Sequence, residues 1–367
     1  MDKEIIHVVN ILVRVPNWLG DSVMSLPFFD VLAAAFPQNR IDIIAKETIR
    51  EVFLHHPAIH TIHPFSKQHV HGIAGLYRYG KYVSSLGPYD AFITLAPSFS
   101  SALIGYSTGC RFRIGYRHEG RSWMFTHSFP EPHGIHRTYV FCNLLRLWLE
   151  RLRETPDSLP SPVSQFSKGQ VHAILFPFSA QEQQTVFLRK HDDSEVFIVF
   201  NVNSEAQSRR LPLEKWIELG NRLLDDQTRR RKLVFVGAPG EESRVQQVIQ
   251  GIRRQEFVLN YAGKTSIREF AMLLRDADLV VTNDSGPMHL ANAVGTPMVT
   301  FIGAADPVET EPFNAGNVIV INKQLACSPC VKNVCKFSTV RCLEQISVEE
   351  IYQASLKLLV PSRHPSA

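Results

Sequence analysis

Residues 279–302, LVVTNDSGPMHLANAVGTPMVTFI, contain the clearest fold signal in the chain. The short apolar run LVVT predicts a buried strand, and Pro297 to Ile302 predicts a second one. Between them, the pattern from Met288 to Val294 predicts a helix, and the polar residues from Asn283 to Pro287 form the connecting loop. Strand, helix and strand in this order are typical of a βαβ unit in a parallel sheet.

The same alternation continues on both sides of this stretch. Strands are predicted at residues 8–15, 40–45, 90–95, 196–201 and 232–236, and helices at residues 22–36, 213–225, 267–275 and 348–359. The segment 155–172 is polar and rich in proline and serine, as linkers are. We therefore predict an α/β protein with two doubly wound domains, residues 1–165 and 172–345, followed by a C-terminal helix and loose tail over residues 346–367.

The carboxyl ends of the strands are where ligands of such sheets bind. With two domains, the cleft between them is the expected site. Residues that perform chemistry are therefore expected in the loops that directly follow strands.

Composition narrows the class of protein. The chain has 367 residues, of which 44% are hydrophobic and 20% charged, as in soluble globular proteins. Its net charge of +4 is far below the basic excess of nucleic-acid-binding domains, so no nucleic-acid partner is expected. No run has the length of a transmembrane helix, and the first residues read as a strand rather than a signal peptide. We expect a cytoplasmic protein.

Four of the six cysteines follow the pattern C-x2-C-x4-C-x6-C, at Cys327, Cys330, Cys335 and Cys342. The first pair fits zinc, but the second spacing is loose for it. Disulfides are not expected without a secretory signal. A four-cysteine zinc or cluster site and reduced structural thiols both remain open, and we expect the second, with no metal and no cofactor.

The loop after the first predicted strand, residues 16–21, reads PNWLGD. Gly20 allows a tight turn before the next helix. Asp21 would then lie at the helix start, where its carboxylate could remove a proton from an attacking hydroxyl. The alternative is that Asp21 only caps the helix, which is a very common role.

The loop 282–289, TNDSGPMH, places Asp284, Ser285 and Gly286 at a helix N-terminus. Backbone N–H groups and the helix dipole attract phosphate there. The alternative is a capping box with His289 as an ordinary helical residue.

Two further loops follow strands in the second half. Residues 203–212 contain Arg209, whose charge could neutralise a leaving diphosphate, although a solvated loop is the alternative. Residues 237–242, GAPGEE, hold only GxxG, which is neither a dinucleotide fingerprint nor a Walker A loop. Glutamates in this loop could meet a ribose hydroxyl, and simple turn chemistry explains the glycines equally well.

The first half contains a dense basic stretch. Arg111, Arg113, Arg117, His118 and Arg121 follow the serine-rich loop 97–101. They could receive an anionic acceptor, or form a solvated basic face. The motif Asp276-Ala277-Asp278 could hold a divalent metal, but it ends a helix just before a strand, so we do not expect it to.

Taken together, these blocks resemble the glycosyltransferase family that contains the lipopolysaccharide heptosyltransferases, glycosyltransferase family 9. The similar blocks are NWLGD (17–21) with SLP (25–27), PSFSSAL (97–103), RIGYRHEGR (113–121), TNDSGPMHLANAVGTP (282–297) and the cysteine-containing tail. They occur in the same order and reach from residue 11 to about residue 345. The blocks at 97–103 and 113–116 resemble the heptosyltransferase II branch more than the first-heptose branch.

The resemblance implies a GT-B fold, two Rossmann-like domains facing each other, and an inverting, metal-independent transfer from ADP-L-glycero-D-manno-heptose. The first domain would bind the acceptor, a heptose linked to Kdo–lipid A, and the second the nucleotide sugar. The enzyme would then make peripheral contact with the cytoplasmic face of the inner membrane.

It also implies roles for individual residues. Asp21 would be the catalytic base. The donor would be bound by Ser204, Glu205, Arg209, Glu241, Asp284, Ser285, Gly286 and His289. The acceptor would be contacted by Trp18, Ser98, Arg117 and Arg121.

Three alternatives remain at this point. A related transferase could add another sugar to a surface glycan. A degenerate relative could hold precursors without turnover. A nicotinamide-dependent oxidoreductase could also have two such domains, but GxGxxG is absent after the first strand of either one.

Overall fold

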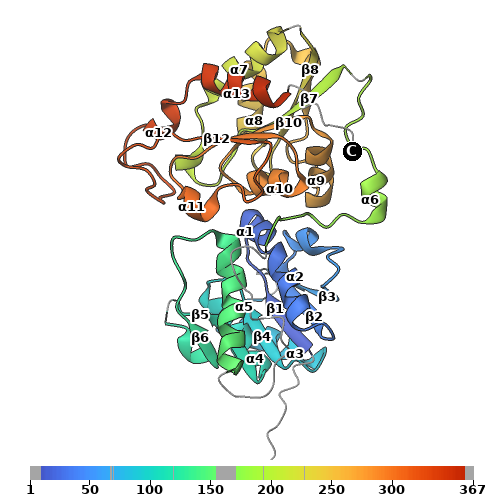
Figure 1. Cartoon of the computed structure of the whole chain (residues 1–367), viewed down its shortest axis with the longest axis vertical. Helices are drawn as coiled ribbons and strands as arrows, with labels where there is room; N and C mark the ends of the chain where they lie inside the picture. Colours follow the sequence, from blue (N-terminus) through green and yellow to red (C-terminus); the bar gives the residue numbers. More distant parts are fainter. Residues whose placement is uncertain are drawn as a thin grey trace, which may run out of the picture. The chain divides into compact units, whose positions relative to one another are not determined.

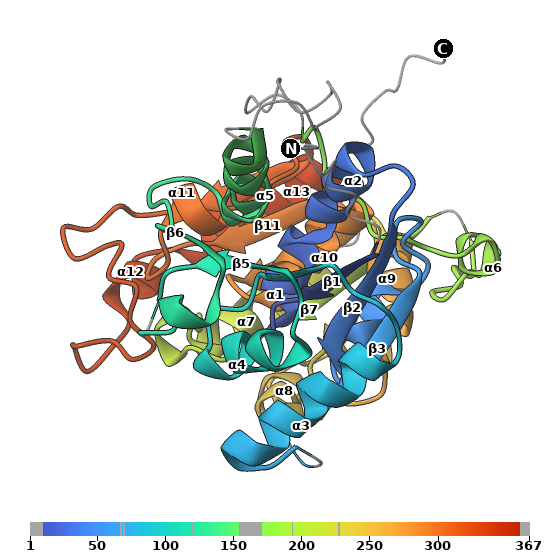
Figure 2. The same ribbon diagram turned by 90° about the horizontal axis from the view of Figure 1, so that it is seen from below.

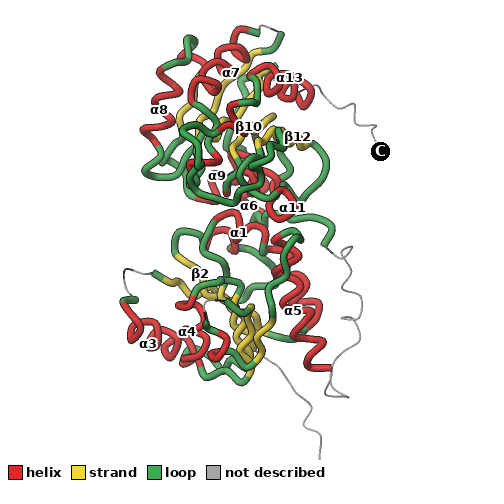
Figure 3. The backbone as a smooth tube through the Cα atoms, turned by 90° about the vertical axis from the view of Figure 1, so that its left-hand side faces the viewer, coloured by secondary structure: helices red, strands yellow, loops and turns green. Residues whose placement is uncertain are grey.

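The structure is a computed structural model that describes residues 10–66, 68, 70–118, 120–153, 171–192, 194–226 and 228–359. The chain divides into two compact units, Met1–Ser179 and Ala180–Ala367. Helices and strands alternate along each unit (Figures 1 and 3). The predicted linker, residues 155–172, falls almost entirely outside the described residues, so the domain boundaries stay a prediction.

The first unit is built on a six-stranded sheet in the order β3-β2-β1-β4-β5-β6, with every pairing parallel. Its strands are β1 (Asn10–Arg14), β2 (Arg40–Lys46), β3 (Thr61–Phe65), β4 (Ala91–Thr94), β5 (Phe112–Tyr116) and β6 (His127–Phe129). Its helices are α1 (Leu19–Met24), α2 (Leu26–Ala35), α3 (Gly72–Ser85), α4 (Phe99–Thr108) and α5 (Arg137–Arg153).

Helices cover both faces of this sheet. Figure 2 shows α2 and α5 on one side and α3 and α4 on the other. The central strand β1 is apolar between its two end residues, and Ile11, Leu12 and Val13 are fully buried, as expected for a parallel strand covered on both faces. Helix α4 starts at the N-cap Ser98 and ends at Gly109, whose left-handed φ of 75° suits a helix C-terminus.

The second unit repeats this architecture with the order β12-β11-β10-β7-β8-β9, again with parallel pairings. Its strands are β7 (Glu195–Asn201), β8 (Arg230–Val236), β9 (Val258–Asn260), β10 (Leu279–Asn283), β11 (Met298–Phe301) and β12 (Val318–Ile321). Its helices are α6 (Ala180–Gln184), α7 (Leu213–Asp225), α8 (Glu242–Gln250), α9 (Ile267–Asp276), α10 (Gly286–Val294), α11 (Pro307–Thr310), α12 (Arg341–Glu344) and α13 (Val348–Leu359).

One large apolar cluster holds the second unit together. It joins β7, β8, β10 and β11 to helices α7, α8 and α13, with Trp216 fully buried near its centre. Helix α9 starts with a reciprocal capping box between Ser266 and Glu269, which satisfies two backbone donors at once. None of the helices in the described residues is long and apolar enough to cross a membrane.

The predicted helix 22–36 is two helices. Helices α1 and α2 meet at Ser25, and Pro27 lies in the first turn of α2. A proline there costs little because the first N–H groups of a helix have no intrahelical partner. The break lets α1 follow the loop after β1 while α2 packs along the sheet.

Gly105 offers a test of the packing between α4 and β4. A Cβ at Gly105 would lie 2.2 Å from a ring carbon of Phe92, so Gly105→Ala is expected to lower the free energy of unfolding by about 1–3 kcal/mol. Gly87→Ala is the matched control, because the nearest atom to its Cβ would be 3.7 Å away. Urea unfolding of both variants measures the difference, and equal stability would contradict this packing.

Candidate active site

The ends of β7 and β10 bring two of the predicted loops together. The strands are paired with Asn201 opposite Thr282. The Asn201 Nδ2 group donates to Thr282 Oγ1 at 2.9 Å and to Ser285 Oγ at 2.9 Å. Ser204 Oγ donates to the Asp284 carbonyl oxygen at 3.2 Å. Three residues predicted to bind the donor, Ser204, Asp284 and Ser285, therefore lie at one edge of the sheet.

Asp284 is an unusual carboxylate for such an edge. It is 1% exposed, and its Oδ2 atom accepts no hydrogen bond from any described residue. An Arg209 Nη1 atom lies 3.5 Å from Oδ2, beyond good hydrogen-bonding distance. Burial raises the pKa of Asp284 to about 6, and the Arg209 charge offsets only part of that rise. Arg209 and Asp284 therefore lie close together, but the Asp284 Oδ2 atom still lacks a hydrogen-bond donor among the described residues. Such an arrangement is expected at a ligand-binding position.

The N-terminus of α10 begins directly after this carboxylate. Ser285 is the N-cap residue, and its side chain makes no capping hydrogen bond in the described structure. The alternative of a capping box is therefore wrong. Gly286 is the first helical residue, Pro287 follows it, and His289 is buried one turn in. The first N–H groups of the nine-residue helix α10 form the kind of terminus that binds anions.

Arg209 is positioned by a short 3-10 helix, Gln207–Arg209. The neighbouring Ser208 is fully buried. Its backbone N–H donates to the Asn333 carbonyl oxygen at 3.0 Å, and its hydroxyl donates to the Lys332 carbonyl oxygen. Lys332 and Asn333 belong to the cysteine-containing loop. That loop therefore braces the segment that carries Arg209.

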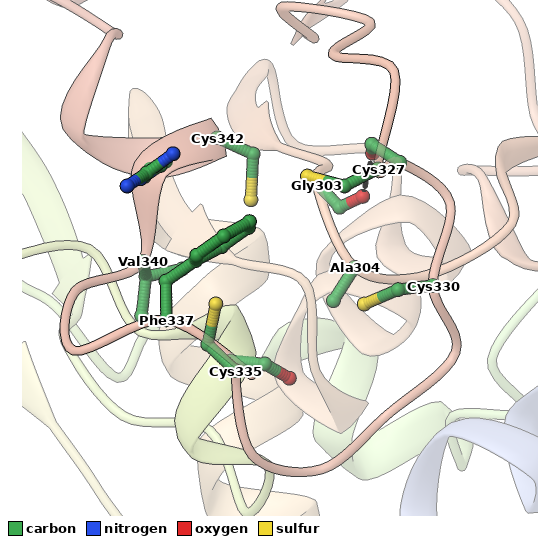
Figure 4. A pocket seen from close by; sticks show the side chains of 11 residues that line it. Gly303, Ala304, Cys327, Cys330, Cys335, Phe337, Val340 and Cys342 are labelled. Atoms are coloured by element: carbon green, nitrogen blue, oxygen red, sulfur yellow. Dashed lines mark hydrogen bonds between the residues drawn. The ribbon is translucent and has the colours of Figure 1, made fainter.

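The cysteine-containing loop surrounds a small pocket. Cys327, Cys330, Cys335 and Cys342 all line it, and Figure 4 shows the sulfur atoms of Cys335 and Cys342 pointing towards the Phe337 ring. Across the described part of the chain, no three His, Cys, Asp or Glu side chains are grouped so that they could hold a metal ion. The N–H groups of Cys330 and Val331 both donate to the Ala304 carbonyl oxygen. These two hydrogen bonds fix the start of the cysteine-containing loop against the segment that follows β11.

The loop after β8 adds a third segment to the edge. A Cβ at Gly237 would lie 2.9 Å from Asn203 Nδ2, so a glycine allows the two loops to approach. Glu241 Oε2 accepts from the Ala238 N–H at 2.8 Å, which holds this side chain against its own loop. Glu205, predicted to bind the donor, is exposed.

The Asp-Ala-Asp motif has a structural role. Asp276 accepts from the N–H groups of Phe187 and Leu188, and Asp278 from Lys190 and the Phe197 N–H. The motif lies before the first residue of β10, at the opposite end of the strand from Asp284. It fastens the segment that leads into β7.

In the first unit, a buried arginine anchors the loop that precedes the predicted base. Arg14 ends β1, and its Nη1 atom donates to the carbonyl oxygens of Val15 and Ile44, each at 3.0 Å. Its Nη2 atom donates to Asn17 Oδ1 at 2.6 Å, which ties the loop to the sheet. Burial lowers the pKa of Arg14 to about 10, so it stays charged at neutral pH. Sequence reasoning missed Arg14 because an arginine inside an apolar strand has no motif.

Asp21 is the third residue of α1 and is half-buried. The N-cap position belongs to Trp18, so the alternative that Asp21 is the cap residue is wrong. Trp18 is 57% exposed, and Lys46 Nζ lies 5.6 Å from its ring centroid. A partly exposed carboxylate beside an exposed aromatic ring is a suitable arrangement for binding and activating a sugar hydroxyl.

The predicted acceptor residues divide into two kinds. Arg121 is 1% exposed, and it donates to the carbonyl oxygens of Ala96, Ser98 and Tyr116. It therefore fastens the loops after β4 and β5 to each other, which suits a positioning residue better than a direct contact. Ser98 caps α4 through the Ser101 N–H. Arg117 is exposed and donates to the Ser128 carbonyl oxygen.

Two parallel-sheet α/β units, each with polar loops at the carboxyl ends of its strands, are the architecture of the GT-B fold of glycosyltransferases. The family description "Glycosyltransferase family 9 (heptosyltransferase)" matches residues 81–341, and the chain belongs to that family.

Individual proteins of this family are similar to the chain in sequence and in structure. Lipopolysaccharide heptosyltransferase 2 of Escherichia coli K12 is 26% identical over 316 residues, which cover 83% of this chain and 86% of that protein. The structure of E. coli ADP-heptose LPS heptosyltransferase II has a TM-score of 0.75 at 23% identity, covering 96% of this chain and 99% of that one. A family 9 glycosyl transferase from Veillonella parvula has a TM-score of 0.79, also at 23% identity, covering 96% and 98%.

Replacement of Arg121 distinguishes positioning from direct contact. Arg121→Leu leaves several buried carbonyl oxygens without a donor and is expected to cost about 2–4 kcal/mol of unfolding free energy. Arg117→Leu, at an exposed position, is expected to change it by less than about 0.5 kcal/mol. Thermal or urea unfolding compares the two variants. A stable Arg121→Leu protein would show that this guanidinium does not hold the loops together.

The raised pKa of Asp284 predicts a pH-dependent effect on stability. Its folded-state pKa of about 6 lies above the ordinary value of 3.8, so ionisation opposes folding, and the penalty grows between about pH 4 and pH 6. Asp284→Asn is therefore expected to raise the free energy of unfolding at pH 8 by about 1–3 kcal/mol. Urea unfolding at pH 8 and pH 4 should show the gain only at pH 8, and a loss of stability at pH 8 would contradict this assignment.

Proposed function

We propose that this protein transfers heptose from ADP-L-glycero-D-manno-heptose to a heptose of the lipopolysaccharide inner core, as a heptosyltransferase II would. The family membership and the names of the relatives support the sugar and the acceptor. The observation in the chain itself that carries the proposal is the buried Asp284 beside Arg209 at the N-terminus of α10. Such an arrangement suits a ligand with a diphosphate and neighbouring hydroxyl groups.

In this proposal the second unit holds the donor. Arg209 and the N–H groups at the start of α10, from Ser285 and Gly286, face the diphosphate. Asp284 accepts a hydrogen bond from a sugar hydroxyl, which would satisfy its unpaired Oδ2 atom. The remaining proposed donor contacts are Ser204, Glu205, Glu241 and His289. Glu205 is exposed, and Glu241 must release the Ala238 N–H to reach a ribose.

The first unit holds the acceptor. Trp18 offers an exposed ring for a sugar face, and Arg117 offers an exposed positive charge for an anionic group of the core. Ser98 and Arg121 act together. Arg121 donates to the Ser98 carbonyl oxygen at 3.1 Å and so fixes the serine-rich loop.

The reaction is a single displacement with inversion. Asp21 removes the proton from the acceptor hydroxyl as its oxygen attacks the anomeric carbon, and the bond from that carbon to ADP breaks. Arg209 and the positive end of α10 stabilise the charge that develops on the leaving diphosphate. Because these groups supply the positive charge, no step in this scheme needs a metal ion. Transfer requires the acceptor in the first unit to meet the donor in the second.

The proposed acceptor is anchored to lipid, so the enzyme works at the cytoplasmic face of the inner membrane. It contacts that membrane peripherally.

Activity measurements with Asp21→Asn test the base. The substrate pair is ADP-heptose with a mono-heptosylated Kdo–lipid A acceptor. The variant is expected to lose about 100-fold to 10,000-fold in kcat because general base catalysis is removed, while calorimetry shows unchanged ADP binding.

Asp30→Asn is the control, since Asp30 is an exposed carboxylate in α2 of the same unit. Full activity of Asp21→Asn would overturn the mechanism. No transfer by the wild type, with ADP still bound, would overturn the substrate assignment.

A further inference from the structure

The net positive charge of this chain comes from one segment. Residues 52–118 contain six Lys and Arg residues and a single acid, Asp90. This segment therefore carries a formal charge of +5, while the rest of the chain, whose total is +4, carries −1. The net charge of +4 is therefore the sum of a basic segment and a much longer, nearly neutral remainder.

Helix α3 lies in the middle of this segment and has two different faces. Gly80 and Val83 are buried, and Leu76 and Tyr79 pack against a neighbouring apolar cluster. A Cβ at Gly80 would collide with Ser107 of α4, so that face is closed by tight helix packing.

The opposite face of α3 exposes large apolar side chains. Ile73 is 70% exposed, Tyr77 42%, Tyr82 59% and the C-cap residue Leu86 45%. Isolated exposed apolar residues are normal, but Ile73 lies one turn before Tyr77, and Tyr82 one turn before Leu86. The exposed side of the helix therefore carries two apolar pairs, which is more than scattered single residues.

The only charged residues of α3 are basic, and both are exposed. Arg78 and Lys81 lie between the apolar positions, and Lys81 Nζ is 5.9 Å from the Tyr77 ring centroid. Tyrosines with aliphatic neighbours and interspersed cations are the composition that proteins use at the boundary between lipid headgroups and acyl chains.

The elements beside α3 extend the same chemistry. Helix α4 packs on α3, and its Tyr106 is exposed, with the Arg113 guanidinium 5.7 Å from the ring centroid. Trp123, which is 63% exposed, packs edge-on against Tyr106 at 5.5 Å between ring centroids. Trp123 therefore continues the aromatic and basic character of the region.

We propose that the exposed face of α3 (Ile73, Tyr77, Arg78, Lys81, Tyr82 and Leu86) docks the enzyme on an anionic phospholipid bilayer. Charge complementarity identifies this occupant, because Arg78 and Lys81, the only charged residues of α3, would pair with anionic headgroups, whereas a second copy of this face would bring the same two cations against them. The proposal deepens the proposed function, since a lipid-anchored acceptor requires the catalytic unit to stand at the bilayer surface.

Vesicle sedimentation tests the surface without any substrate. The 367-residue protein is mixed with vesicles of phosphatidylethanolamine containing about 30% phosphatidylglycerol, or with vesicles of phosphatidylcholine alone. The lipid concentration is chosen so that about half of the wild-type protein sediments with the anionic vesicles. Binding is expected only to the anionic vesicles, and raised salt is expected to weaken it. Arg78→Glu/Lys81→Glu is expected to lower the partition coefficient at least tenfold.

The matched control is Lys332→Glu/Lys336→Glu. It changes the net charge by the same amount at exposed lysines of the second unit. An equal loss of binding in the control would show non-specific attraction and overturn the proposal. Two other results would also overturn it. One is equal sedimentation of the wild type with anionic and with neutral vesicles. The other is self-association of the wild type that is lost in Arg78→Glu/Lys81→Glu.

A fluorescence reporter tests direct insertion. Ile73→Trp is expected to shift its emission to the blue when anionic vesicles are added, and Val186→Trp, at an exposed position of the second unit, is expected to show no shift. Equal responses of the two reporters would contradict docking through α3.

Measurements of heptose transfer distinguish an effect on membrane docking from an effect on the catalytic site. Arg78→Glu/Lys81→Glu is expected to keep wild-type transfer to detergent-solubilised acceptor and to lose it with acceptor embedded in vesicles. If no protein transfers heptose at all, the proposed function fails, while the vesicle results still decide on the docking surface.

Discussion

The parallel pairing of β7 with β10 is the constraint on which the candidate active site depends. Because both strands run in the same direction, with Asn201 opposite Thr282, their following loops leave the sheet at the same edge. The Asn201 amide then joins Thr282 to Ser285. This bridge fixes the start of α10, and with it the positions of Asp284 and of the helix N-terminus. The first unit uses the same geometry, since β1 and β4 are neighbours and are followed by the Asp21 and Ser98 loops.

Buried charges keep these loops in place, and each is stabilised in a different way. Arg14 and Arg121 donate to carbonyl oxygens near the ends of strands. The dipoles of these carbonyl groups compensate the two positive charges, and the hydrogen bonds hold the loops in place. Asp284 is different, because its Oδ2 atom accepts no hydrogen bond among the described residues and the nearest cation, Arg209, is 3.5 Å away. The protein tolerates an unfavourable carboxylate at that position, which is typical of functional residues that gain their partner from a ligand.

Much of the fold could be predicted from the sequence because the central strands are buried on both faces. Runs such as VFIVFN and LVVT are apolar without interruption, and all seven predicted strands coincide with observed ones. Four of the five missed strands, β3, β6, β9 and β12, are the edges of their sheets. Edge strands are only partly buried, so segments such as TIHPF and HSF carry no continuous apolar signal.

The site was predicted less completely, for a physical reason. Loop motifs predict Asp21, Arg209 and Asp284 as site residues. Arg14 and Asn201, which tie the loops after β1 and β10 to their sheets, are single polar residues at the ends of apolar strands. Their roles depend on which strands are neighbours, which the sequence does not specify. The role of the cysteine-containing loop was hidden in the same way, since its backbone braces Ser208 from more than 120 residues away along the chain.

The central claim is that Arg209 and the start of α10 bind the donor diphosphate. Calorimetric titration of the wild type and Arg209→Gln with ADP and with adenosine tests it most directly. The account predicts at least tenfold weaker ADP binding by the variant, with adenosine binding unchanged, because only the diphosphate meets the guanidinium. Equal ADP affinity in the two proteins would contradict it.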